Sequence, residues 1–160
     1  MLRLMVLLLA LTLPLAAGAQ THRVAVMPIK FLDTSHEPED QRAQHEARLS
    51  LMHSVLKDEV AVGEVVEIQP QEVSAACPDE TPECLLKLAA AQGSDHAIFV
   101  SVLKTSTLIM QIYVQVMDVR ESRLVLRRDL SFRGDNDESW RRAARFLADV
   151  LTTSLAPQPE

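Results

Sequence analysis

The segment LIMQIYVQVMDV, residues 108–119, decides the fold of this 160-residue chain. Apolar side chains occupy every second position from Met110 to Val116, and Gln111, Tyr113 and Gln115 stand between them. This two-residue period is typical of a strand that buries one face and leaves the other at least partly wet. We therefore expect a strand here, within a sheet that has one well-buried face.

Two further strand-like runs flank this segment, at residues 97–103 and 124–132. The connections between the runs, residues 104–107 and 120–122, are short enough only for antiparallel neighbours. The sequence therefore predicts a three-stranded antiparallel meander.

Upstream of the meander, β-branched and aromatic side chains at residues 23–32 predict one buried strand, in which Pro28 marks a bulge or a strand end. Pro38 fits the first position of a helix that runs to about Val60. A short strand is expected at residues 65–68.

Two helical segments follow that short strand. Residues 71–76 favour a helical turn. A helix then begins after Thr81, whose hydroxyl can cap it, with Pro82 at its first position and Gly93 as its stop.

Downstream of the meander, apolar positions at helical spacing from Trp140 to Leu151 predict a closing helix that Trp140 anchors to the sheet. The order is then strand, helix, strand, helix, three strands, helix. We expect an α/β (α+β) fold in a single domain over residues 20–155, with a mixed five-stranded sheet and helices on one face or, unevenly, on both. Residues 156–160 are expected to form a disordered tail.

The first residues have the features of a secretory signal peptide: Arg3, an apolar run, and a small-x-small cleavage site at Ala17-Gly18-Ala19. The run is shorter than the ~20 residues of a membrane span, and no second run follows. We therefore expect a signal peptide over residues 1–19 and a mature periplasmic chain from Gln20. Because no cysteine ends the run, we expect no lipid anchor, and no membrane insertion after cleavage.

The chain has two cysteines, Cys77 and Cys84. In an exported protein this pair predicts a disulfide. A redox-active pair is the alternative, since Cys84 stands near a helix N-terminus, but the C-x-x-C spacing is missing.

Charge is distributed unevenly along the chain. The mature chain carries 15 basic and 22 acidic residues, a formal net charge of −7, which argues against nucleic acid and anionic lipid as partners. Eight of the basic residues are arginines between Arg120 and Arg145. We expect some of them to form a basic face for a protein partner, or else simply to solvate a helix and a sheet edge; the residues of this face are Arg127, Arg133, Arg141, Arg142 and Arg145.

Asp135, Asp137 and Glu138 offer hard oxygen ligands, so a cation site is the alternative functional reading of this segment. The same residues are explained by a helix N-cap at Asp135 or Asp137, with Glu138 completing a capping box. The five histidines are expected to face solvent, because His45 and His53 are spaced too far apart for one ion.

The sequence contains no constellation that carries chemistry. A nucleophile elbow, a phosphate loop and a strand-end cluster of acids and bases are all missing. We therefore expect a protein that is not an enzyme and that needs no cofactor.

The passage from Cys84 to Val100 joins an alanine-rich helix, a Gly93-Ser94-Asp95 stop and an immediate strand, and the meander's second turn is charged after Asp118-Val119. In this the chain resembles envelope proteins of the TolB amino-terminal and curli-secretion CsgG type. It is also similar to small exported Gram-negative proteins of unknown function, in which an Arg-Gly-Asp followed by Ser-Trp, here residues 133–140, precedes the last helix.

This resemblance implies a small non-catalytic periplasmic α/β domain that docks other envelope proteins. The chain lacks the propeller of TolB, and it lacks the anchor cysteine and membrane-spanning hairpins of CsgG, so no functional residue carries over. Two hypotheses remain: an accessory protein-interaction module of the cell envelope, and a periplasmic binder of a small ligand or hard cation. Homodimerisation through a sheet edge stays open.

Overall fold

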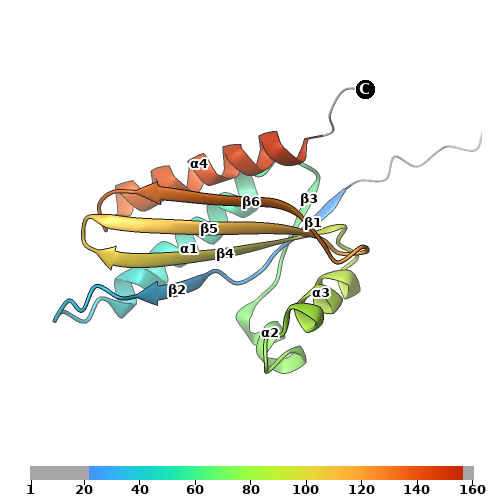
Figure 1. The fold of residues 1–160 in the computed structure, drawn as a ribbon, viewed down its shortest axis with the longest axis horizontal. Coiled ribbons are helices and arrows are strands. Elements are labelled where there is room, and N and C mark those ends of the chain that lie inside the picture. Colours follow the sequence, from blue (N-terminus) through green and yellow to red (C-terminus); the bar gives the residue numbers. More distant parts are fainter. Residues whose placement is uncertain (1–21, 157–160) are drawn as a thin grey trace, which may run out of the picture.

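The alternating segment around Met110 forms β5 (Ile109–Asp118), the middle strand of an antiparallel meander with β4 (His96–Ser106) and β6 (Arg123–Phe132). The structure is a computed structural model that describes residues 22–156 (Figure 1). The apolar positions of β5 are buried on one face of the sheet and its polar positions lie on the other, which confirms the predicted meander and its period. The predicted signal peptide lies outside the described residues.

Two short parallel strands extend the sheet beyond β4: β1 (Arg23–Val26) pairs with β4, and β3 (Glu64–Glu67) pairs with β1. The prediction of one continuous strand over residues 23–32 was wrong. The chain leaves the sheet at Pro28 and returns as β2 (Lys30–Asp33), which pairs with β4 further along. Proline has no N–H for a strand ladder, so the pairing is interrupted there. Within the described residues the sheet therefore has six strands, one more than predicted.

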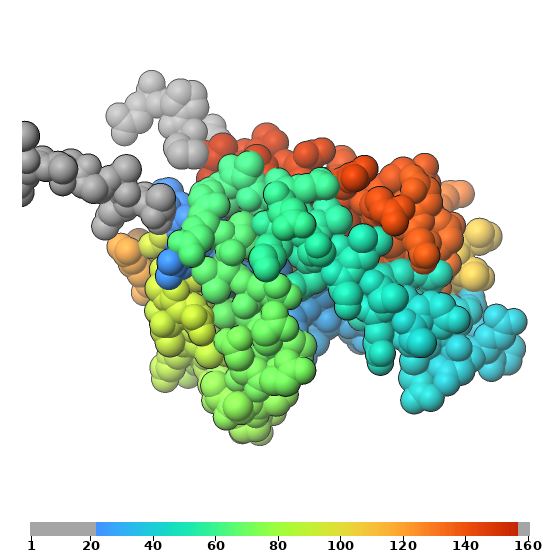
Figure 2. Space-filling model, turned by 180° about the vertical axis from the view of Figure 1, so that it is seen from behind, coloured from blue at the N-terminus to red at the C-terminus, as the bar shows by residue number. Residues whose placement is uncertain are grey.

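One face of the sheet is covered by two long helices that pack side by side, α1 (Arg42–Glu59) and α4 (Asp137–Leu155). Figure 2 shows this face, with α1 in cyan and α4 in red. Trp140 is fully buried in the core between the helices and the sheet, which confirms it as the anchor of α4. Helix α1 begins four residues later than predicted, because the segment before it is held outside the helix. There the side chains of Glu37 and Gln41 accept hydrogen bonds from the buried Lys104.

Among residues 22–156, the other face is covered only at the end of the sheet that holds β1. Helices α2 (Pro70–Ala76) and α3 (Pro82–Ala91) lie there over a second, smaller apolar cluster. Thr81 caps α3 as predicted, with its hydroxyl accepting from the Cys84 N–H at 3.4 Å. The helices therefore cover the two faces unevenly. Within residues 22–156, no helix is long and apolar enough to span a membrane.

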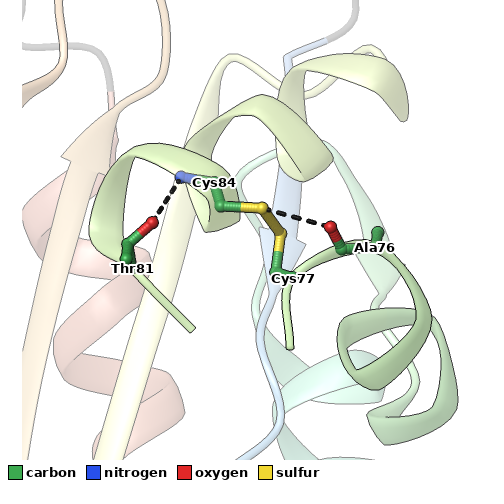
Figure 3. The surroundings of a disulfide bond; sticks show 4 residues. All are labelled: Ala76, Cys77, Thr81 and Cys84. Atoms are coloured by element: carbon green, nitrogen blue, oxygen red, sulfur yellow. Dashed lines mark hydrogen bonds between the residues drawn. A yellow bond between two sulfur atoms is a disulfide. The ribbon is translucent and has the colours of Figure 1, made fainter. Parts of the chain in front are cut away.

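The predicted disulfide is present between Cys77, at the end of α2, and Cys84, in the first turn of α3 (Figure 3). The two Cα atoms are 5.7 Å apart, which is an ordinary separation for a disulfide. The Cys84 Sγ also lies 3.3 Å from the Ala76 carbonyl oxygen, a contact without a proton, since a disulfide sulfur carries none. Cys77 is buried, so the bond fastens the two helices to each other and to the smaller apolar cluster.

Candidate docking site

A buried cluster of charged side chains joins three segments at one end of the sheet. Lys104, on β4, has no solvent exposure, and its Nζ donates to Glu37 Oε2 and Gln41 Oε1, both at 2.7 Å. The same Nζ lies 2.8 Å from Asp135 Oδ2. Burial by itself lowers the pKa of Lys104, but hydrogen bonds to Asp135 and Glu37 outweigh that effect and raise it. All three protons of the ammonium group therefore have acceptors.

Asp135, in the connection between β6 and α4, is the centre of this cluster. In addition to Lys104, its Oδ2 accepts from His45 Nε2 at 2.8 Å, and its Oδ1 accepts from Arg48 at 2.7 Å and from Trp140 Nε1 at 2.9 Å. Burial by itself raises the pKa of Asp135, but hydrogen bonds from His45, Lys104 and Trp140 lower it to about 2. The carboxylate is thus charged and fully hydrogen-bonded, which suits a structural role and leaves no lone pair for acid–base chemistry.

This arrangement leaves Asp135 unavailable as a metal ligand. It therefore argues against the hypothesis of a cation site at Asp135, Asp137 and Glu138. The oxygens of Asp135 are already occupied by four donors, Asp137 accepts from Arg48 at 2.9 Å, and Glu138 lies 3.3 Å from Arg141. In the part of the chain that the structure describes, no three His, Cys, Asp or Glu side chains form a group that could hold a metal ion.

Two smaller predictions about these residues were wrong. The N-cap of α4 is Asn136, whose Oδ1 accepts from the Ser139 N–H at 3.0 Å, because Asp135 is turned inward toward Lys104. His45 was expected to face solvent, but it is buried between Phe31 and Asp135. Both side chains belong to the buried charged cluster, and only their tertiary contacts show this membership.

The structure splits the predicted arginine face. Arg127 is paired with Gln115 across β5 and β6, so it lies on the face of the sheet away from α1 and α4. Arg145 turns toward α1 and lies 3.2 Å from Glu59. Arg133 and Arg142, by contrast, line the same groove. Arg141 lies beside Glu138 on α4.

This β6 groove runs between β6 and α4 and has a volume of about 310 Å³. It is lined on one side by Leu130 and Phe132 of β6, and on the other by Ala143 and Phe146 of α4. Phe146 is 58% exposed, whereas Trp140 on the same helix is fully buried. The lining contains two arginines and no carboxylate; its residues are Ile112, Leu130, Ser131, Phe132, Arg133, Ser139, Arg142, Ala143 and Phe146.

Leu130, Phe132 and Phe146 were not predicted from the sequence as residues of a docking site. One signal was available for Phe146, because it falls outside the apolar spacing that joins Trp140 to Leu151 and so belongs to the polar side of the helix. An aromatic side chain on the polar side of an amphipathic helix favours a contact with something outside the domain. Nothing local distinguishes Leu130 and Phe132 from core residues.

Strand β6 is itself a free edge. The sheet order β3-β1-β4-β5-β6 leaves it paired with β5 alone within the described residues, and Figure 1 shows α4 running along the same edge. Ten residues without proline present a row of backbone donors and acceptors to solvent.

A larger cleft, about 560 Å³, lies on the other side of α1, between that helix and the segment that leads into α2. In Figure 2 it opens as a notch between the cyan helix and the green segment. His53 Nδ1 lies 2.7 Å from Glu67 Oε1 at this cleft, and its Nε2 is buried without a partner among the described residues. Burial by itself raises the pKa of Glu67, but hydrogen bonds from Gln69 and His53 outweigh that effect and lower it.

The family model DUF3280, described as a protein of unknown function (DUF2380), matches residues 22–150, so the chain belongs to this family. This agrees with the predicted resemblance to proteins of unknown function. No curated protein resembles the chain closely enough in sequence to count as a match.

Solved structures share the fold at low sequence identity. The PelC dodecamer from Paraburkholderia phytofirmans is 16% identical, with a TM-score of 0.52 over 86% of this chain and 90% of that one. TolB from Acinetobacter baumannii is 13% identical, with a TM-score of 0.52 over 88% of this chain but only 30% of TolB. The lipoprotein GNA1162 from Neisseria meningitidis is 13% identical, with a TM-score of 0.50 over 82% of this chain and 99% of that one. The expected TolB-like fold is thus confirmed, and the likeness to CsgG stays a prediction.

Proposed function

We propose that the mature chain is a non-catalytic, periplasmic interaction module of the cell envelope, which docks another envelope protein through β6 and the β6 groove. The observation that carries this proposal is the exposed Phe146 beside a free, ten-residue edge strand. Exposed apolar surface next to unpaired backbone is a common arrangement for binding a protein segment.

Two further observations support a docking role. Asp135, which makes four hydrogen bonds or ion pairs, has all its acceptor positions filled. The cluster therefore suits a structural role better than a catalytic one. TolB and a neisserial lipoprotein share the fold, in keeping with the expected export of this chain and its place in the envelope.

The test is site-specific photo-crosslinking in the periplasm. A benzophenone amino acid replaces Phe146 in one variant and Leu108 in a matched control, since Leu108 is also apolar and exposed but lies at the β4–β5 turn. We expect one envelope protein to be crosslinked from position 146 and not from position 108. The same products from both positions, or none from either, would contradict the proposal.

A second candidate function, binding of a small ligand, is favoured by the unpartnered His53 Nε2 at the larger cleft. His53→Gln keeps a polar side chain at this position and replaces the imidazole ring with an amide. A small molecule that raises the melting temperature of the wild type and not of His53→Gln would support this candidate. A library in which every hit stabilises both proteins equally would exclude binding at His53.

A further inference from the structure

We infer that the occupant of the β6 groove is an extended, acidic segment of the partner, which pairs with β6 as an added strand. This inference rests on the proposed docking function and names the chemistry of what is docked.

The free edge sets the backbone geometry of the occupant. A segment that satisfies the unpaired N–H and C=O groups of β6 must be extended itself, because strand pairing requires matching β conformation. The backbone of such a segment would continue the order β3-β1-β4-β5-β6 by one strand.

The side chains of β6 determine where the occupant needs apolar residues. Leu130 lies opposite Ile112 and Phe132 opposite Met110, so both point to the face that α4 covers. Phe132 also packs edge-on against Trp140, with ring centroids 5.6 Å apart. An added strand would direct every second side chain to this same face, where it would meet Phe146. The occupant should therefore carry apolar residues at alternate positions.

The charge of the groove selects an acidic segment. Arg133 lines it with no salt bridge to a described residue, and Arg142 has a long contact of 3.9 Å with Glu138 and a 3.5 Å hydrogen bond to the Ser139 hydroxyl. Arg128 lies on the same face of β6 as Leu130, and its one side-chain hydrogen bond within residues 22–156 goes to the Arg127 carbonyl oxygen. This basic edge stands on a chain whose formal net charge is −6. Complementary charge favours an acidic occupant and raises its association rate.

The same charges disfavour a second copy of this chain as the occupant. A two-fold antiparallel pair of β6 strands centred on Arg127 would place Arg127 directly against itself. A pair centred on Arg128 would place Arg128 against itself and Arg127 opposite Asp129. Like charges directly opposite across strands are destabilising. The sheet-edge homodimer that the sequence left open therefore has no support from β6.

Peptide selection on the mature protein tests the chemistry of the occupant. A displayed library of random linear peptides is selected on the wild type and counter-selected on the double variant Arg133→Glu, Arg142→Glu. We expect the recovered peptides to be enriched in Asp and Glu, with apolar residues at alternate positions. A synthetic copy of the most frequent peptide should bind the wild type at least about tenfold more tightly than the double variant, because each reversal places like charges together.

Two controls make the result specific. Arg120→Glu reverses an arginine that is 75% exposed in the turn before β6, outside the proposed binding edge, and should bind as the wild type does. A peptide methylated on alternate backbone nitrogens should lose binding if strand pairing holds it, and the unmodified peptide should slow hydrogen exchange of the β6 amides.

Several outcomes would overturn the inference: no enriched peptide, peptides without acidic residues, or equal binding to the wild type and the double variant. If crosslinking from position 146 still captures an envelope protein, the docking function stands and only the acidic strand fails. If the crosslinked product is a second copy of the chain, the occupant is the protein itself. If both experiments are negative, the docking function fails as well.

Discussion

Lys104 and Asp135 are two fully buried charges whose partners come from distant parts of the chain. Transfer of a lone ion into a protein interior costs several kcal/mol, and the cost is offset only if every donor and acceptor is paired. Here the ammonium has three acceptors and the carboxylate has four donors. The pair therefore fixes the entry to α1, the strand β4 and the entry to α4 relative to one another.

Asp135→Asn tests this role. The substitution leaves Lys104 buried and Arg48 largely buried without the central carboxylate, so we expect the free energy of unfolding to fall by about 3–5 kcal/mol. Urea denaturation of the mature protein measures it. Asp137→Asn is the matched control: its carboxylate is 75% exposed, and the expected loss is less than about 1 kcal/mol. Equal losses in the two variants would contradict the assignment.

At the scale of the element, α4 depends on a cap that the sequence did not single out. Asn136→Ala removes the acceptor for the Ser139 N–H, and we expect it to cost about 1 kcal/mol of stability. Asn136→Asp keeps an acceptor at the same position and should restore most of the loss. Denaturation curves of the two variants, recorded side by side, measure the difference. An equal loss of stability in both variants would mean that Asn136 does not stabilise α4 by accepting the Ser139 N–H hydrogen bond.

Helices α2 and α3 depend on the disulfide between Cys77 and Cys84. A loop this short contributes roughly 2–3 kcal/mol at most by chain entropy. We therefore expect Cys77→Ala with Cys84→Ala to lower the melting temperature, and a reductant to lower the wild type to the same value. The reductant should leave the double variant unchanged. If reduction has no effect on the melting temperature of the wild type, the bond is not structural, and the redox alternative becomes the better one.

At the scale of the whole molecule, several lowered carboxylate pKa values predict acid sensitivity. The pKa of Asp135 falls from 3.8 to about 2 on folding, so its contribution is complete above about pH 4 and is lost as the pH falls toward 2. The pKa values of Asp33, Glu37 and Asp118 are lowered too, and they act in the same direction.

We therefore expect the free energy of unfolding to decrease as the pH is lowered through this interval, with about 2 kcal/mol of the decrease due to Asp135. Denaturation at a series of pH values measures it. The curve of Asp135→Asn should be shallower by that amount. Parallel curves for the wild type and the variant would show that Asp135 does not titrate as the structure implies.

The sequence by itself determined the local features of this protein. Alternation around Met110, short connections, and capping by Thr81 depend on neighbouring residues, so the meander and the start of α3 could be predicted. Two cysteines in a chain that is expected to be exported were enough to predict the disulfide. Pro28 was recognised as a disruption, but whether the chain left the sheet or only bulged depends on the partner strand.

Only the tertiary structure decided the rest. Lys104, His45 and Asp135 are far apart in the sequence, and each alone resembles a solvated residue; their burial follows from contacts that no local pattern records. The β6 groove likewise requires β6 to be an edge and α4 to lie along it, which is a property of strand order. The five arginines were grouped by sequence, but Arg127 lies on the face of β6 away from the helices, whereas Arg133 follows the end of that strand and lines the groove with Arg142 of α4.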